Sequence, residues 1–205
     1  MININFRKIL KYDPTFAGTY SKYDGYQIIG TQEIDPEIEK NQENEIQIPE
    51  NLLFPVFSSS LKRGIQTTQR YFDVNYITAL DELKEVKFDL RNLLTHHEYE
   101  KFGSNLVRER FIEAFINDSL LEKREDIKKR ILFLQNLFSN LVEGNYLVIS
   151  HSFFMKIFDT YILNKNIFEK PDLLRSIFDY REKTFDFGEG FNFRVDNSVV
   201  NKSNL

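Results

Sequence analysis

The sequence contains no cysteine and no tryptophan, and only three of its 205 residues are histidine. Without cysteine the protein can form no disulfide and has no thiolate for catalysis or metal binding. The absence of cysteine favours a reducing compartment, and we expect the protein to be cytoplasmic. Twenty phenylalanines and ten tyrosines are present. Phenylalanine is therefore expected to fill much of the core.

Long apolar runs and clustered positive charge are also missing. No apolar run approaches the roughly 20 residues needed to span a bilayer, and residues 1–14 lack the apolar core and cleavage site of a signal peptide. The 31 acidic residues outnumber the 27 lysines and arginines, whereas binding to nucleic acid or anionic membranes requires clustered basic side chains. We therefore expect neither nucleic acid nor membrane as a partner.

The length and the apolar pattern indicate one α/β domain over residues 1–196, followed by a polar tail at 197–205. Short apolar runs predict strands at 2–6, 52–59, 74–77 and 146–150, and the sequence FDFGEGFNF predicts a hairpin at 185–193. Apolar residues at three- and four-residue steps predict helices at 61–72, 98–115, 122–142 and 153–163. The acidic segment at 31–50 is expected to be solvated and without a chemical role.

The sequence FSSSLKRGIQT, residues 57–67, places three serines at the end of a buried strand and Arg63 in the first turn of the next helix. Backbone N–H groups and the helix dipole favour an anion there, and a guanidinium adds a planar pair of donors for phosphate oxygens. A surface arginine on an amphipathic helix is the simpler explanation of Arg63 taken alone.

A second segment, YLVISHSFF at 146–154, places His151 between a buried strand and the start of a helix. In open α/β sheets, ligands bind beyond the carboxyl ends of the strands. A histidine there can donate to a phosphoryl oxygen, although a capping or packing histidine explains the pattern equally well.

Together the two segments resemble the signatures of the histidine phosphatases, the phosphoglycerate mutase-like superfamily. Residues 57–67 resemble a strand followed by Ser-x-Leu-x-Arg-Ala and Gln-Thr, and residues 146–154 resemble an apolar strand that ends in Ser-His. The resemblance extends over residues 4–194. It implies a three-layer α/β/α fold with a mostly parallel central sheet. It also implies that Arg63 binds the transferred phosphoryl group and that His151 stabilises its charge in the transition state.

The family also has a carboxylic acid in a Leu-x-Glu pattern after the third strand. In the sequence LKEV this position is Glu85, whose implied role is to protonate the leaving oxygen. Glu82 is an alternative, and a solvated charged stretch explains both residues without catalysis. Four further residues are candidates for substrate contacts or are simply solvated surface side chains: Arg108, Arg110, His96 and His97.

The start of the chain departs from the family pattern. The family's first strand ends in Arg-His-Gly, and its histidine is the phosphorylated nucleophile. Here the sequence INFRKIL matches the arginine with Arg7 but has Lys8 in place of the histidine. A lysine stays protonated near neutrality unless its pKa falls by several units, so Lys8 is expected to bind an anion rather than attack a phosphate.

The sequence therefore predicts a phosphate-binding pocket formed by Arg7, Lys8, Arg63 and His151. The expected partner is a phosphorylated small molecule or a phosphate or sulfate anion, with weak or no phosphatase activity and with neither a metal ion nor a cofactor. One alternative is an active phosphatase or phosphomutase on a small phosphate ester that uses an atypical nucleophile. Another is a non-catalytic interaction protein. The sequence identifies neither the ligand nor the oligomeric state.

Overall fold

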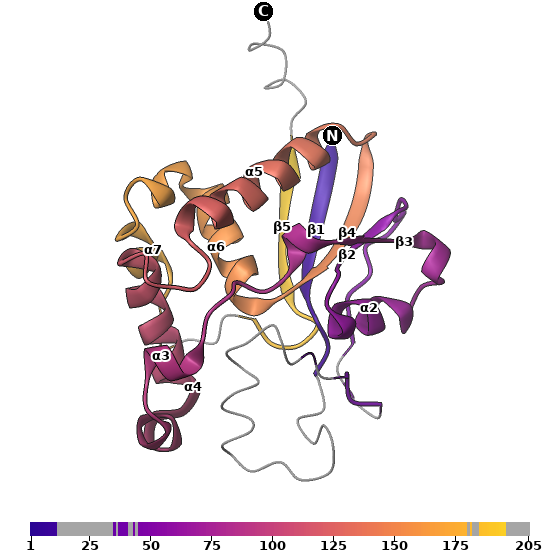
Figure 1. The fold of residues 1–205 in the computed structure, drawn as a ribbon. Coiled ribbons are helices and arrows are strands. Elements are labelled where there is room, and N and C mark those ends of the chain that lie inside the picture. The colour runs from indigo at the N-terminus through magenta and orange to yellow at the C-terminus, as the bar shows by residue number, and fades with distance from the viewer. Residues whose placement is uncertain are drawn as a thin grey trace, which may run out of the picture.

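A computed structural model describes residues 1–11, 35, 37–40, 43, 45–179, 181 and 185–195. Its five strands form one sheet in the order β3-β2-β4-β1-β5. The strands are β1 (Ile2–Lys8), β2 (Val56–Ser59), β3 (Ile77–Leu80), β4 (Gly144–Ser150) and β5 (Gly190–Val195). All neighbouring pairs are parallel except β1 and β5, which are antiparallel. The predicted α/β fold with a mostly parallel sheet is confirmed (Figure 1).

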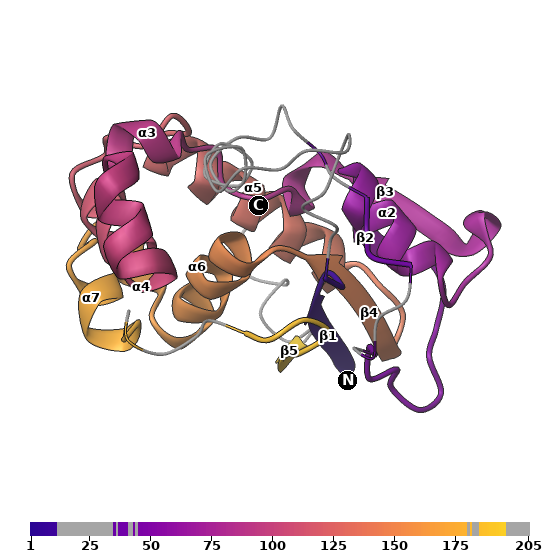
Figure 2. The same ribbon diagram turned by 90° about the horizontal axis from the view of Figure 1, so that it is seen from below.

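The helices lie on both sides of this sheet. They are α2 (Lys62–Gln69), α3 (Leu90–Leu93), α4 (His96–Ile116), α5 (Arg124–Ser139), α6 (Ser152–Leu163) and α7 (Leu173–Ile177). Helix α2 lies on one side, whereas α5 and α6 lie on the other, with α3, α4 and α7 beyond α6 (Figures 1 and 2). No helix in the described part of the chain combines the length and apolar character that crossing a membrane requires.

Successive side chains of a strand point to opposite faces of the sheet, and each face has its own apolar cluster. Phe6 and Val148 belong to a cluster of thirty buried residues that includes apolar side chains of α5 and α6. Leu147 and Ile149 point the other way, into a cluster of six buried residues beside the end of α2. Ten of the thirty residues in the larger cluster are phenylalanine, which agrees with the expectation from composition.

Three of the predicted strands differ from the structure. The strand predicted at 52–59 covers only Val56–Ser59. Residues 74–76 form a short 3₁₀ helix, because the Asp73 side chain accepts from the N–H of Asn75 and caps that turn, and the strand begins only at Ile77. The predicted hairpin at 185–193 is wrong because β5 pairs with β1 rather than with residues 185–187. Gly190 permits this pairing, since a Cβ there would lie 1.9 Å from the carbonyl oxygen of Phe6.

The boundaries of the four predicted helices shift by at most three residues. Helix α4 extends over 96–116 but is kinked at Gly103, whose φ of 60° and ψ of −148° suit only glycine. Helix α5 covers 124–139, within the predicted 122–142. The predicted polar tail at 197–205 lies outside the described residues.

Three parallel strands end together at one edge of the sheet. Lys8 of β1 is in register with Ser150 of β4, and Ser58 of β2 is in register with Ile149. The residues that follow β2 and β4 therefore emerge side by side. This edge carries most of the residues that the sequence singled out.

Candidate anion-binding site

His151 lies directly after β4 and occupies the N-cap position of α6. It is 2% exposed, and its Nε2 lies 2.8 Å from the Oγ of Ser59, at the end of β2. Burial lowers the pKa of His151 well below its usual range, and the positive charges of Arg63, Arg130 and Lys8 lower it further. The imidazole is therefore neutral at pH 7.

The turn from β2 into α2 is tightly packed around Ser59. The Ser59 hydroxyl accepts from the N–H of Leu61 at 3.3 Å, and the side chain is fully buried. A Cβ at Gly64 would lie 2.7 Å from the Ser59 carbonyl oxygen, so α2 approaches β2 as closely as only glycine permits. This packing suits Ser59 to position the His151 ring.

Arg63 lies in the first turn of α2 and is 8% exposed. Its Nη1 donates to Asp35 Oδ1 at 2.8 Å, and its backbone N–H donates to the same oxygen at 3.3 Å. The backbone N–H of Lys62 donates to the other oxygen of Asp35. The Arg63 guanidinium and the N-terminus of α2 thus bind the same carboxylate anion. The expectation that residues 31–50 are solvated is therefore wrong at Asp35, whose side chain is 22% exposed and bound to the start of α2.

Glu85 lies beside His151 because its carboxylate caps the start of α6. Its Oε1 accepts from the N–H groups of Val86 and Phe154, both at 2.9 Å, and its Oε2 accepts from Phe153 at 3.2 Å. Burial raises the pKa of Glu85, while these three backbone donors and the charge of Arg63 act in the opposite direction. Glu82, the alternative, contributes its backbone carbonyl to Arg130.

Arg130 of α5 is a site residue that sequence reasoning missed. Its guanidinium donates to the carbonyls of Glu82 and Lys84, and Nη1 binds Glu122 Oε1 at 2.6 Å. It also lies 4.3 Å from the ring centroid of Phe154. These contacts hold the chain just before Glu85 against α6. The sequence has no signal for this role, because Arg130 follows two other basic residues in a charged helix.

The two basic residues of β1 point to different partners. Lys8 Nζ donates to the carbonyl of Phe185 at 3.0 Å and lies 4.1 Å from the Phe187 ring centroid, and its charge reaches His151. Arg7 Nη1 instead donates to the carbonyl of Phe6 at 2.7 Å and to Asn192 Oδ1 at 2.8 Å. The charge of Lys8 thus acts on His151, whereas the Arg7 guanidinium is directed toward β5.

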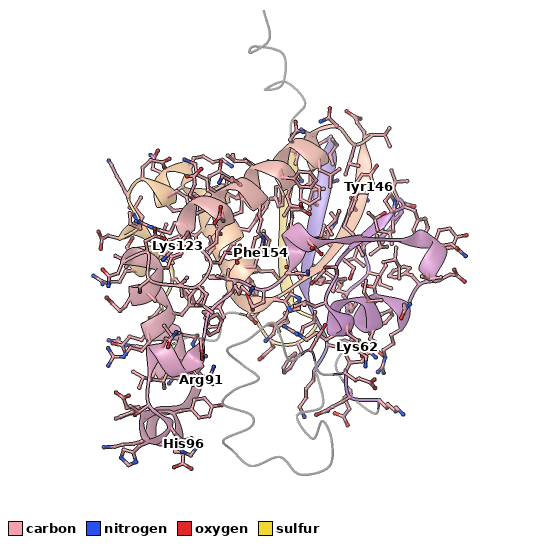
Figure 3. The ribbon with its side chains drawn as sticks, in the orientation of Figure 1. Lys62, Arg91, His96, Lys123, Tyr146 and Phe154 are labelled. Carbon is pink, nitrogen blue, oxygen red and sulfur yellow. The ribbon has the colours of Figure 1, made fainter. Side chains whose placement is uncertain are left out.

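The four remaining candidates lie on α4. Arg108 is buried and contacts Asn105, Arg110 lies 3.8 Å from Glu98, and His96 lies 3.9 Å from Glu100. His97 is exposed. Figure 3 shows His96 well away from Lys62 at the start of α2. The side-chain contacts described for these residues are therefore within α4 rather than with Arg63 or His151.

A scan against models of known protein families gives no match, and a search of curated proteins gives none either. The function is therefore inferred from the chemistry of the residues around Arg63 and His151.

Proposed function

We propose that the protein binds a phosphorylated ligand, or an inorganic oxyanion such as phosphate or sulfate, at Arg63, His151 and Lys8. The main support is that these residues, far apart in the chain, meet at one edge of the sheet, where the charges of Arg63 and Lys8 reach His151. Two cations, the N-terminus of α2 and a neutral imidazole form a suitable environment for an oxyanion.

The same arrangement supports placing the chain in the histidine phosphatase superfamily, with its phosphoglycerate mutase-like three-layer fold. The two segments that resemble the family signatures follow β2 and β4, and these strands are direct neighbours in the sheet. Helices lie on both sides of that sheet (Figure 2). That Arg63 and His151 follow neighbouring strands supports this assignment.

Two observations support weak or absent phosphatase activity. Lys8 stands at the nucleophile position, but its ammonium donates to the Phe185 carbonyl and lies over an aromatic ring, contacts in which it acts as a cation and donor rather than as a nucleophile. The hydroxyl that contacts His151, that of Ser59, is completely buried. Neither group is suited to attack a phosphorus atom.

Glu85 favours a second candidate function, a slow phosphatase in which water attacks the ester. A carboxyl whose pKa is raised by burial stays protonated to higher pH and can protonate a leaving oxygen. Its position beside His151 is suitable for that role. In this reading Arg63 holds the phosphoryl group, and Glu85 is the acid.

Thermal unfolding in the presence of phosphate or vanadate tests the binding proposal. A ligand at 100 times its dissociation constant stabilises a protein by about 2.7 kcal/mol, so the melting temperature of the wild type should rise. Arg63→Ala should abolish the rise. Arg175→Ala is the matched control, because Arg175 pairs with Glu113 on the surface and should leave the response intact. Wild-type protein that responds no more than in chloride of equal ionic strength would rule out the site.

A screen of phosphate monoesters separates the two candidate functions. Turnover close to background is expected at neutral pH in wild type. Robust turnover that is lost in both Arg63→Ala and Glu85→Gln, with Arg175→Ala unaffected, would favour the slow phosphatase and exclude the non-catalytic reading.

A further inference from the structure

The acidic segment formed by Asp35, Glu37, Ile38, Glu39 and Lys40 is fastened along α2. The Ile38 N–H donates to Gln66 Oε1 at 3.0 Å, and the Ile38 side chain packs against the smaller apolar cluster. Three further contacts hold the segment. Glu37 forms an ion pair with Lys62, the Arg70 guanidinium donates to the carbonyl of Lys40, and the N–H of Glu39 donates to the carbonyl of Lys11. Asp35 is thus held at the start of α2 by its neighbours as well as by its own carboxylate.

Asp35 satisfies the donors that an oxyanion would use. Its two oxygens accept from the backbone N–H groups of Lys62 and Arg63 and from the Arg63 guanidinium. Two negative groups cannot share these donors without strong repulsion, because like charges a few Å apart near a protein surface repel each other strongly. An external anion and the Asp35 carboxylate are therefore alternatives at Arg63.

We propose that Asp35 is an internal ligand of the anion site, and that an external oxyanion binds by displacing its carboxylate from Arg63. This inference rests on the proposed function and adds a form of regulation to the same site. Because Asp35 occupies the site when no external anion is bound, the apparent affinity is the intrinsic affinity multiplied by the fraction of molecules in which Asp35 is displaced. Dianions, such as phosphate monoesters and sulfate, gain more from Arg63 and Lys8 and are favoured over monoanions.

The test measures the affinity for inorganic phosphate by titration calorimetry in wild type, Asp35→Asn and Glu37→Gln. Asparagine keeps an oxygen to cap α2 and removes the negative charge, so the fold is preserved. Asp35→Asn should bind phosphate about tenfold more tightly than wild type, as expected when a competing state is removed. Glu37→Gln is the matched control, because it removes an equal charge from the same segment at a partly exposed pair with Lys62. Its affinity should stay within about twofold of wild type.

The outcomes distinguish this inference from the function on which it rests. Equal affinity in wild type and Asp35→Asn, with binding abolished by Arg63→Ala, overturns the internal ligand and leaves the binding function intact. An equal gain in Glu37→Gln also overturns it, because general charge then explains the effect. Absence of phosphate binding in all variants overturns both proposals. Binding seen only in Asp35→Asn, and lost in Asp35→Asn/Arg63→Ala, supports displacement. If Asp35→Asn does not fold, Asp35→Ser, which also caps a helix, takes its place in the same measurement.

Discussion

The face of the sheet beneath α5 and α6 and the face beneath α2 differ in size and in chemistry. Thirty buried residues, many of them aromatic, form the cluster on the first face, whereas six aliphatic residues form the cluster on the second. Hydroxyl groups hold α2 in addition to apolar packing: Thr68 Oγ1 donates to Ser58 Oγ at 3.0 Å, and Thr67 Oγ1 accepts from the N–H of Leu10 at 3.1 Å.

This difference indicates that one face of the sheet mainly stabilises the fold and the other mainly carries the site. Burial of apolar area is the main source of folding free energy, so the phenylalanine-rich face provides most of the stability. The α2 side has fewer apolar contacts and more buried polar groups, and it carries Arg63 and the bound Asp35 carboxylate. Regions of this kind open at lower free energy than the core, which suits a site where a ligand must displace an internal group.

The largest effect on stability is expected from Phe6→Ala. Phe6 is fully buried, and its ring centroid lies 4.9 to 6.2 Å from those of four other phenylalanines: Phe138, Phe158, Phe191 and Phe193. Removal of a buried phenylalanine ring lowers the free energy of unfolding by about 3–5 kcal/mol. Urea denaturation measures this loss. Phosphate binding by the protein that remains folded should be unchanged.

Leu147→Ala, on the opposite face, should cost less but disturb the site more. Leu147 is fully buried in the smaller cluster, and the loss is expected near 2–3 kcal/mol, at the low end for such substitutions. Because this cluster packs against Tyr71 and Phe72, which lie just after α2, phosphate should bind more weakly than in wild type. Titration calorimetry with phosphate on both variants, at a temperature where each is folded, measures whether only Leu147→Ala weakens binding. Equal weakening by Phe6→Ala and Leu147→Ala would contradict this difference between the two faces.

Gly64→Ala tests the close approach of α2 to β2. The added Cβ would meet the Ser59 carbonyl oxygen at 2.7 Å, so α2 or Ser59 must move. Such overpacking costs about 1–3 kcal/mol. The free energy of unfolding should fall by this amount, and phosphate affinity should fall with it because Ser59 contacts His151. A variant as stable as wild type would show that the junction is not tight.

The pH dependence of stability tests the buried state of His151. Its folded-state pKa lies below its unfolded value of about 6.5, so the unfolded chain binds the extra proton first. The free energy of unfolding should therefore fall as the pH drops below 6.5, by at most about 1.4 kcal/mol per pH unit, and level off below the folded-state pKa.

The His151→Gln variant isolates this contribution. Glu85 acts in the opposite sense, because its raised pKa makes the folded state bind the proton more tightly between pH 4.5 and its folded-state pKa. The difference between wild type and His151→Gln, measured by denaturation from pH 8 to pH 5, removes the part due to Glu85. A difference that does not change with pH would show that His151 is not buried in its neutral form.

Lys8→Met should have the smallest effect on stability. The substitution removes a cation–π contact with Phe187 and the hydrogen bond to the Phe185 carbonyl, and the expected loss is below about 1 kcal/mol. The charge of Lys8 also lowers the pKa of His151, so that pKa should rise in the variant. NMR titration of the imidazole measures it. An unchanged titration would place Lys8 outside the electrostatic site.

By itself the sequence determined the α/β class, the order of most strands and helices, and the positions of Arg63 and His151 after buried strands. These features depend on local apolar periodicity and on residues adjacent in the chain, which sequence patterns carry directly. The pairing partner of β5 could not be derived in this way. The sequence FDFGEGFNF matches a hairpin locally, but in the assembled sheet β5 pairs with β1, which lies more than 180 residues earlier in the chain.

Only the tertiary structure decided which side chains meet at the site. Asp35 is 28 residues from Arg63 in the chain, and Ser59 is 92 residues from His151, so neither contact has a local signature. The hydrogen bond from Arg7 to Asn192 and the contacts of Arg130 with the chain before Glu85 likewise have no local signature. The direction of a long side chain depends on the partners that packing brings within reach, and those partners are set by the assembled sheet and helices rather than by neighbouring residues.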